Sequence, residues 1–378
     1  MKKFGRVFLF VLIFLCITTY SFSFEWGGSL NTNINVYNED LIPTEKTSFT
    51  IAENAILWGK LKINDTMLFQ MEGGYEVKSN FETTSQNVNL DFFGIKMGFY
   101  PSSVAQIDVD LGRIFISDSY GLIFNNSVDG GKLKISLPVA NLSMFAGYTG
   151  LLNGKNFQIV NSTIEVDQDA IYSFAPGFVV AGFDITSKNT FENHSLGLNV
   201  SSFVPVQKNE TRPTSIYGQI YANGPIVNSL YYDLVAAVGI YTENQLKAGV
   251  MMNGEVAYYP SFIKSIFSAN ILFATDTFYS FIDPSVVIAK QNSINGILKF
   301  GLATSIRPLD SLLVTLGGDF AMDVEGSNVF VDCFQWTTSA SWQILSDIKL
   351  ALNLGQKIGL NEDSTDSFFG ALSFVLNY

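Results

Sequence analysis

The sequence predicts an all-β protein: a transmembrane antiparallel β-barrel of 16 to 18 strands, with 18 preferred. The 378 residues are apolar and poor in charge, since charged residues make up 15% and mean hydropathy is +0.24. Soluble domains average about 25% charged residues. No apolar run after the N-terminal segment reaches the ~18 residues that a spanning helix needs. Segments of about ten residues alternate apolar and polar side chains instead, and a closed barrel is the other structure that can span a bilayer.

Residues 1–23 are predicted to be a secretory signal peptide. A basic start precedes the apolar run 7–17, which is too short to span a membrane, and small residues around Ser23 predict cleavage after it. The residue before Cys16 is a bulky Leu, which disfavours a lipoprotein signal. The barrel is then residues 24–378, which keep all 34 acidic residues but lose three of the 22 basic ones, for a net charge of −15.

Only Cys333 remains after this cleavage. Neither a disulfide nor a Cys-based metal site is therefore expected. An exported chain of this size without such links must gain its stability from the hydrogen-bonded ladder of a barrel.

The strand pattern begins directly after the cleavage site. In the first segment Trp26, Leu30 and Ile34 share one face while Ser29 and Asn33 share the other, because successive side chains of a strand alternate. One face of most later segments is almost free of charge, as lipid contact requires. The predicted strands are 24–37, 49–63, 67–78, 88–99, 104–116, 131–137, 142–149, 178–187, 195–204, 214–222, 229–241, 246–258, 265–275, 293–305, 311–323, 329–342, 347–358 and 367–378.

The connections alternate in length. Tight turns such as 64–66 and 100–103 are predicted on the periplasmic side, because barrels of this class have short periplasmic turns and longer outer loops. The longer outer loops are then 38–48, 79–87, 117–130, 150–177 and 276–292.

The last strand ends on an aromatic residue. Phe374, Leu376 and Tyr378 share one face, and the pattern resembles the C-terminal signal by which outer-membrane barrels reach their assembly machinery. The resemblance implies that these three residues form an assembly signal and that this machinery is a partner.

The segment 111–133 resembles Gram-negative outer-membrane porins. Leu111-Gly112-Arg113-Ile114-Phe115 is followed by Asp118 and Gly121, and then by Val128-Asp129-Gly130-Gly131-Lys132-Leu133. In that family a strand ending in Gly-Arg leads into a third loop that folds into the barrel and narrows the pore. The resemblance implies that 117–130 is this constriction loop, with Asp118 and Asp129 on it. The family's cluster of arginines facing the loop is missing, because the chain after residue 23 holds only Arg113, Arg212 and Arg307.

Charged side chains on the polar faces are the candidates for setting ion preference, as charge rings do in channels. A hydrated wall with no preferred solute is the alternative. The acidic excess suggests cation preference, and Lys132 and Lys134 opposing the loop acids would make a mixed-charge narrowing. The candidate constriction and lumen residues are Arg113, Asp118, Asp129, Lys132, Lys134, Glu72, Glu76 and Asp319.

Catalysis is not expected. His194, the only histidine, falls in a predicted periplasmic connection, where a solvated turn residue is a better explanation than a general base. Gly154-Lys155 fails the phosphate-loop pattern in its spacing and its final residue. We therefore predict no enzyme, no catalytic residue, no cofactor and no metal site.

These observations favour a porin in the bacterial outer membrane: a water-filled channel for passive diffusion of small hydrophilic solutes and ions. The alternatives are a transporter of apolar solutes of the fatty-acid type, suggested by 33 Phe residues, and an adhesin with a passive barrel. The fatty-acid type would place a plug before the first strand, and an adhesin would need larger outer loops. Outer-membrane lipid is the expected surroundings, no nucleic-acid partner is expected, and a homotrimer is left open.

Overall fold

The computed structural model describes residues 23–38, 47–80, 82–157, 170–191, 193–206, 213–242, 246–281, 294–361 and 364–378. It contains eighteen strands, each of which overlaps one of the predicted strands. They are β1 (Ser23–Asn38), β2 (Thr47–Asn64), β3 (Met67–Ser79), β4 (Thr84–Ser102), β5 (Ala105–Ser117), β6 (Asn125–Ser136), β7 (Ala140–Tyr148), β8 (Phe178–Phe191), β9 (His194–Pro205), β10 (Thr214–Val227), β11 (Leu230–Thr242), β12 (Leu246–Tyr258), β13 (Ser265–Ala274), β14 (Ile297–Leu309), β15 (Leu312–Glu325), β16 (Asn328–Gln343), β17 (Ile348–Gly359) and β18 (Ser367–Asn377).

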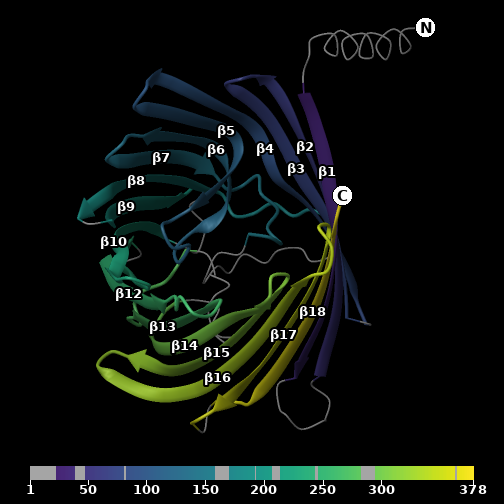
Figure 1. The fold of residues 1–378 in the computed structure, drawn as a ribbon, viewed down its shortest axis with the longest axis vertical. Coiled ribbons are helices and arrows are strands. Elements are labelled where there is room, and N and C mark those ends of the chain that lie inside the picture. Colours follow the sequence, from purple (N-terminus) through teal and green to yellow (C-terminus); the bar gives the residue numbers. More distant parts are fainter. Residues whose placement is uncertain are drawn as a thin grey trace.

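The strands close into one antiparallel barrel in chain order (Figure 1). Every strand pairs with the next one along the chain, and β1 pairs with β18 from Ser29 opposite Asn377 to Asn38 opposite Phe368. Closure removes the unpaired edges that an open sheet would expose. The predicted fold class is confirmed, with eighteen strands rather than sixteen.

Within the described ranges, no helix combines the length and the apolar character needed to cross a membrane. The predicted signal peptide lies outside the described residues, apart from Ser23, which is the first residue of β1.

The two ends of the barrel differ in their connections. At one end, here the turn end, tight turns such as 65–66, 103–104 and 310–311 join the strands. At the other end, here the loop end, lie the two longest connections, 149–177 and 275–296. The longest connections lie at the end opposite the tight turns, as predicted, although the loop end also has tight connections such as 326–327.

The outside of the barrel is apolar. Strand after strand presents large apolar side chains to the surroundings on one face, and Leu57 and Leu302 are 59% and 70% exposed. A soluble monomer rarely exposes a continuous apolar surface of more than a few hundred Å². The exposed apolar residues include Leu30, Leu57, Met71, Phe93, Leu111, Met144, Phe183, Val200, Ile220, Leu234, Met252, Ile271, Leu302, Leu316, Leu352 and Phe374.

The two sides of the barrel interior differ in polarity. On β15–β18 and β1, here the polar half, the inward faces carry amides and hydroxyls such as Asn31, Ser339 and Asn353. On β8–β14, here the apolar half, many inward side chains are apolar and buried. The buried residues of that half include Phe178, Val180, Phe203, Tyr217, Val235, Ala237, Met251, Leu272 and Ile297.

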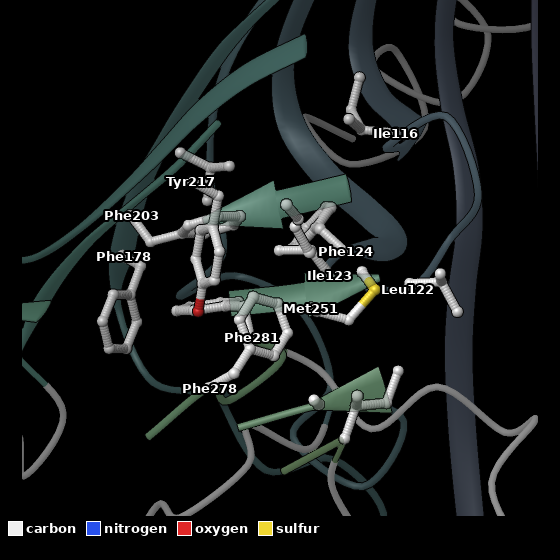
Figure 2. Close-up of a cluster of buried hydrophobic side chains, with 14 of the residues drawn as sticks. Ile116, Leu122, Ile123, Phe124, Phe178, Phe203, Tyr217, Met251, Phe278 and Phe281 are labelled. Carbon is white, nitrogen blue, oxygen red and sulfur yellow. The ribbon is translucent and has the colours of Figure 1, made fainter. Parts of the chain in front are cut away.

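Connections from the loop end fold into the barrel and cover the apolar half. Phe281 lies in van der Waals contact with Phe203, with ring centroids 3.9 Å apart, and its backbone N–H donates to the carbonyl of Ile123 at 3.0 Å. Figure 2 shows the side chains of Leu122, Ile123 and Phe124 beside Met251 and Phe281. Burying each large apolar side chain contributes roughly 1.5–3 kcal/mol. The main apolar core of this protein therefore lies inside the barrel and holds its loops there.

Candidate functional site

The hairpin of β5 and β6 leaves the barrel wall at a row of four glycines. Gly94, Gly112, Gly130 and Gly147 are directly opposite one another across β4, β5, β6 and β7. A Cβ on Gly94, Gly112 or Gly130 would collide with a carbonyl oxygen of the neighbouring strand, and Gly112 has a φ of +116°. Glycine is the residue that permits such close backbone approach. Past this row the rest of the hairpin, 113–129, lies inside the barrel.

Asp118 organises the tip of this hairpin, residues 118–124. Its carboxylate accepts hydrogen bonds from the backbone N–H groups of Ile123 and Phe124 at 3.0 and 2.8 Å. The side chain of Gln219 on β10 donates to the same carboxylate at 2.9 Å. Asp118 is buried and fully engaged, so its charge serves the conformation of the hairpin tip rather than the surface of a pore.

The hairpin tip reaches the opposite wall of the barrel. The Tyr120 hydroxyl donates to Asp233 on β11, and the Ser119 hydroxyl donates to Asp184 on β8 at 3.3 Å. The ring of Tyr120 makes an edge contact with Tyr221 on β10, at a centroid distance of 5.9 Å. Residues 118–124 therefore cross the lumen, as the resemblance to porins implies for this region.

The boundaries and roles expected within 117–130 need correction. Strand β6 begins at Asn125, not at 131, so Asp129 lies on a strand and not on the loop. There it faces Arg113 and binds it with two parallel hydrogen bonds of 2.8 Å. Gly130, which follows Asp129, belongs to the glycine row that bends the hairpin inward.

Arg113 joins three segments. Besides Asp129, its guanidinium donates to the carbonyl of Leu90 on β4 at 3.0 Å and to that of Leu151 at 2.8 Å. Its side chain is only 6% exposed. Arg113 is therefore a structural residue that fixes the hairpin, and it offers little to a passing solute.

The departure of the hairpin leaves the loop-end part of β4 without β5 as a partner, because their pairing stops at Phe93 opposite Arg113. The connection between β7 and β8 takes this place. The Val88 N–H donates to the carbonyl of Ile171 at 3.2 Å, and the Asn153 side chain donates to the carbonyl of Val88 at 2.7 Å. Residues 149–157 and 170–177 thus complete the wall, and they present exposed Leu151, Ile171 and Phe174.

Glu72 and Glu76 line a cavity of about 650 Å³ on the loop-end side, here the loop-end cavity. It lies between the inward faces of β2–β4 and the inserted hairpin. Its described lining holds three carboxylates, no Lys, Arg or His, and many side-chain amides. The carboxylates are Glu72, Glu76 and Asp91, and the amides are Asn54, Gln70, Asn87, Asn89, Asn125, Asn126, Asn153 and Asn156.

Lys132 and Lys134 line a second cavity of about 630 Å³, here the turn-end cavity. It continues along the same strands toward the turn end. Lys132 is opposite Asp110, and Lys134 is opposite Asp108. The two lysines therefore face acids of the neighbouring strand, not the hairpin acids that the sequence suggested. The charges of this cavity nearly balance: Lys60, Lys62, Lys96, Lys132 and Lys134 against Glu25, Asp65, Asp108 and Asp110.

Trp58, Glu72 and Phe92 lie at the level between the two cavities. They are directly opposite one another on β2, β3 and β4. The Lys60 ammonium lies 4.9 Å from the Trp58 ring centroid, and that of Lys96 lies 4.8 Å from the Phe92 ring centroid. From the loop end toward the turn end, the side chains on this wall thus change from amides and acids to aromatic rings and then to lysines.

Asp319 lies on the inward face of β15. Its carboxylate is 3.4 Å from the Lys299 ammonium, and both side chains are mostly buried. It lines neither of the two cavities.

The predicted assembly residues lie at the seam where the barrel closes. Leu376 is opposite Leu30 of β1 and Ile348 of β17. Phe374 is 38% exposed and Tyr378 is 63% exposed. Tyr378 and Gly28 exchange two backbone hydrogen bonds of 3.0 Å. The terminal aromatic residue is therefore part of the seam and open to the surroundings.

The fold matches solved structures of outer-membrane proteins. OpdK from Pseudomonas aeruginosa, solved with vanillate, aligns with a TM-score of 0.63 at 12% identity over 94% of this chain and 99% of its own. OccAB1 from Acinetobacter baumannii aligns with a TM-score of 0.63 at 10% identity over 94% and 96%. OccK5 from Pseudomonas aeruginosa gives 0.60 at 14% identity over 94% and 98%. This chain shares their fold. No protein-family model and no curated protein matches its sequence.

Sequence reasoning missed the anchoring of the loops inside the barrel. The signal was present in β11 and β12, where Val235, Ala237 and Met251 interrupt the expected polar face with apolar residues. A strand that is apolar on both faces is buried on both faces. These residues therefore predict that other apolar side chains cover the inward faces of β11 and β12, in addition to the lipid contact on their outward faces.

Proposed function

We propose that this protein is an outer-membrane channel for passive diffusion of small hydrophilic solutes and ions. The observation that carries the proposal is a pair of cavities along β2–β4: the loop-end cavity, rich in amides and carboxylates, lies between the barrel wall and the inserted hairpin, and the turn-end cavity carries nine charged side chains. Eighteen-stranded barrels enclose space for an aqueous channel, as porins of 16–18 strands do. The hairpin narrows that space without filling the polar half.

The proposed location is the bacterial outer membrane, with the loop end outside. The exposed apolar side chains around the barrel would contact lipid, which is the partner their chemistry fits. Aromatic residues are exposed near the turn end, where amphipathic rings would meet the headgroups. These include Trp26, Tyr100, Tyr258, Tyr259 and Trp342.

Export and assembly complete the proposal. Residues 1–23 would direct secretion, and Phe374, Leu376 and Tyr378 would present the seam strand to the assembly machinery. Replacing the exposed ring of Tyr378 by Ala should lower the amount of folded barrel in the membrane, whereas Tyr378→Phe should not. Equal amounts in both variants would contradict the assembly role.

An apolar-solute transporter fits the interior less well. The apolar cluster offers no open surface, because Phe203, Phe278 and Phe281 are fully buried. Amides and carboxylates dominate the lining of the loop-end cavity instead, and the turn-end cavity carries five lysines and four acids. His194 is hydrogen-bonded to the Tyr232 hydroxyl at 2.9 Å, a contact that suits a structural residue better than a general base.

Recording from planar bilayers tests the channel directly. Purified, folded protein should give stepwise ionic conductance. Folded protein that inserts into the bilayer without conducting would refute the proposal.

A further inference from the structure

The loop-end cavity has the chemistry of a site for a polyhydroxylated solute. The side chains of five of its polar residues make no hydrogen bond to another group in the described ranges: Asn54, Gln70, Glu72, Glu76 and Asn125. Each carries a planar amide or carboxylate with two polar atoms, which can bond a pair of adjacent hydroxyls. The hydrogen-bond donors and acceptors of these five side chains can therefore bind water or a solute.

A second group of amides makes this wall rigid. Asn87 donates to Asn156 at 2.5 Å, and Asn153 donates to Asn87 at 2.6 Å. Asn153 is 1% exposed and Asn87 is 8% exposed. The free amides are therefore presented by a wall whose own polar groups are satisfied, and a preorganised site loses little entropy on binding.

Phe115 adds an open aromatic face. It lies on the inserted hairpin and lines the cavity, and it is 55% exposed although its neighbours Ile114 and Ile116 are buried. An aromatic face is electron-rich, so it attracts the weakly positive C–H groups on the face of a sugar ring. Free amides on the wall and an open ring on the hairpin face the same cavity.

The charge of the cavity argues against an anion. Glu72, Glu76 and Asp91 line it, and its described lining holds no cationic side chain. Arg113, the nearest guanidinium in the wall, is engaged by Asp129 and two carbonyls. The volume of about 650 Å³ falls within the ~300–1,000 Å³ of small-molecule sites.

We propose that the loop-end cavity binds a neutral polyhydroxylated solute, a sugar or short oligosaccharide, on its way through the channel. The hydroxyls bond the free amides and carboxylates on the inward faces of β2 and β3 and the amide of Asn125 on β6, while one ring face lies on Phe115. This inference rests on the proposed channel function and names its solute class.

The experiment records the current of single channels in planar bilayers with maltotriose added on the loop-end side. Binding should interrupt the current, more often at higher concentration. Asn54→Ala, Asn125→Ala and Phe115→Leu should each weaken this block about threefold to tenfold, the loss expected for one or two contacts. Matched controls lie on the inward face of the polar half: Asn353→Ala and Phe369→Leu should leave the block unchanged.

The charge variant separates a sugar site from a cation site. Glu72→Gln with Glu76→Gln removes two charges but keeps groups that bond hydroxyls, so maltotriose should still block within about twofold. A channel that spermidine blocks and maltotriose does not, with the spermidine block lost in this double variant, would overturn the proposal. So would a sugar block that the three cavity variants leave intact. Absence of any current would refute the channel itself, whereas a conducting channel that ignores maltotriose refutes only this inference.

Discussion

The polar half and the apolar half of the barrel interior are built from the same kind of strand but meet different neighbours. On the polar half, Asn353 is exposed inside the barrel, and its neighbours across the strands are Ser339 and Ala371. On the apolar half, Ala237 at a comparable inward position is 1% exposed. The inward face of the polar half is therefore exposed, whereas the inward face of the apolar half is covered by loops.

The difference shows how a barrel can restrict its lumen with its own loops. A hairpin inside a wide barrel needs both a bend and an anchor. The glycine row supplies the bend, and the apolar half supplies the anchor through burial of Phe124 and Phe281. In the described ranges the polar half presents mainly amides and hydroxyls, so its inward face gives the loops little apolar surface to pack against.

The largest expected effect comes from removing the hairpin tip. Replacing 119–123 by Gly-Gly should raise single-channel conductance severalfold, because these residues cross the lumen to Asp184 and Asp233. Ser327→Gly in the tight loop-end connection 326–327 is the control for a more flexible loop-end turn and should change little. Unchanged conductance in the first variant would leave the channel in place and remove the constriction.

A large stability difference is expected between the two halves. Phe281→Ala should lower the free energy of unfolding by about 3–5 kcal/mol, the usual cost of deleting a buried aromatic side chain. Asn353→Ala should change it by no more than about 0.5 kcal/mol. Urea unfolding in lipid vesicles, followed by tryptophan fluorescence, measures both. Equal effects would show that the apolar cluster does not hold the loops.

The comparison also explains what the sequence could predict. Alternation of apolar and polar residues located all eighteen strands, because lipid contact imposes a period of two on one face regardless of the partner strand. Turn length and polarity located the connections. These signals are local, so they need no knowledge of the fold.

The roles of single residues depended on contacts that the sequence does not display. Arg113 and Asp129 become partners only through the register of β5 and β6, and Gly94 and Gly147 align with them only through two further registers. Asp118 resembled a pore charge, but the fold buries it among backbone donors. Glu72 and Glu76 line the loop-end cavity, and period-two alternation alone decides which face of a strand such residues share.

A smaller effect is expected from breaking the Arg113–Asp129 pair. Arg113→Gln should cost about 1.5–3 kcal/mol, the range for hydrogen bonds to charged groups. A double-mutant cycle with Asp129→Asn should show a coupling of about 0.5–3 kcal/mol. Independent effects of the two substitutions would contradict their pairing. The loosened hairpin should also make the open-channel current noisier.

Ion preference should depend on the loop-end cavity and not on the hairpin acids. Glu72→Gln with Glu76→Gln should lower cation preference, whereas Asp118→Asn should leave it nearly unchanged because Asp118 is buried and engaged. The reversal potential in a salt gradient measures this, and dilute salt gives the largest difference because screening is weakest there. A larger shift from Asp118→Asn would restore that residue as a pore charge.

The smallest effect is expected at the turn end. Lys264 lowers the pKa of Asp310 through a side-chain hydrogen bond and its charge. A carboxyl group with a lowered pKa stabilises the folded state above its unfolded pKa, near 3.8, and this contribution disappears as pH falls below that value. Because both side chains are exposed to solvent, Asp310→Asn should not measurably change unfolding at neutral pH. A clear loss of stability there would show that the turn end is more rigid than its exposure indicates.

The division of the interior into an open half and a filled half is tested most directly by thiol labelling. In a Cys333→Ala background, single cysteines replace Asn353 and Ser339 on the polar half, and Val235 and Ala237 on the apolar half. A hydrophilic, charged thiol reagent added during bilayer recording should reduce the current quickly through the first pair and leave it unchanged for the second. Rapid block through Val235→Cys and Ala237→Cys, or no block through Asn353→Cys and Ser339→Cys, would contradict the division.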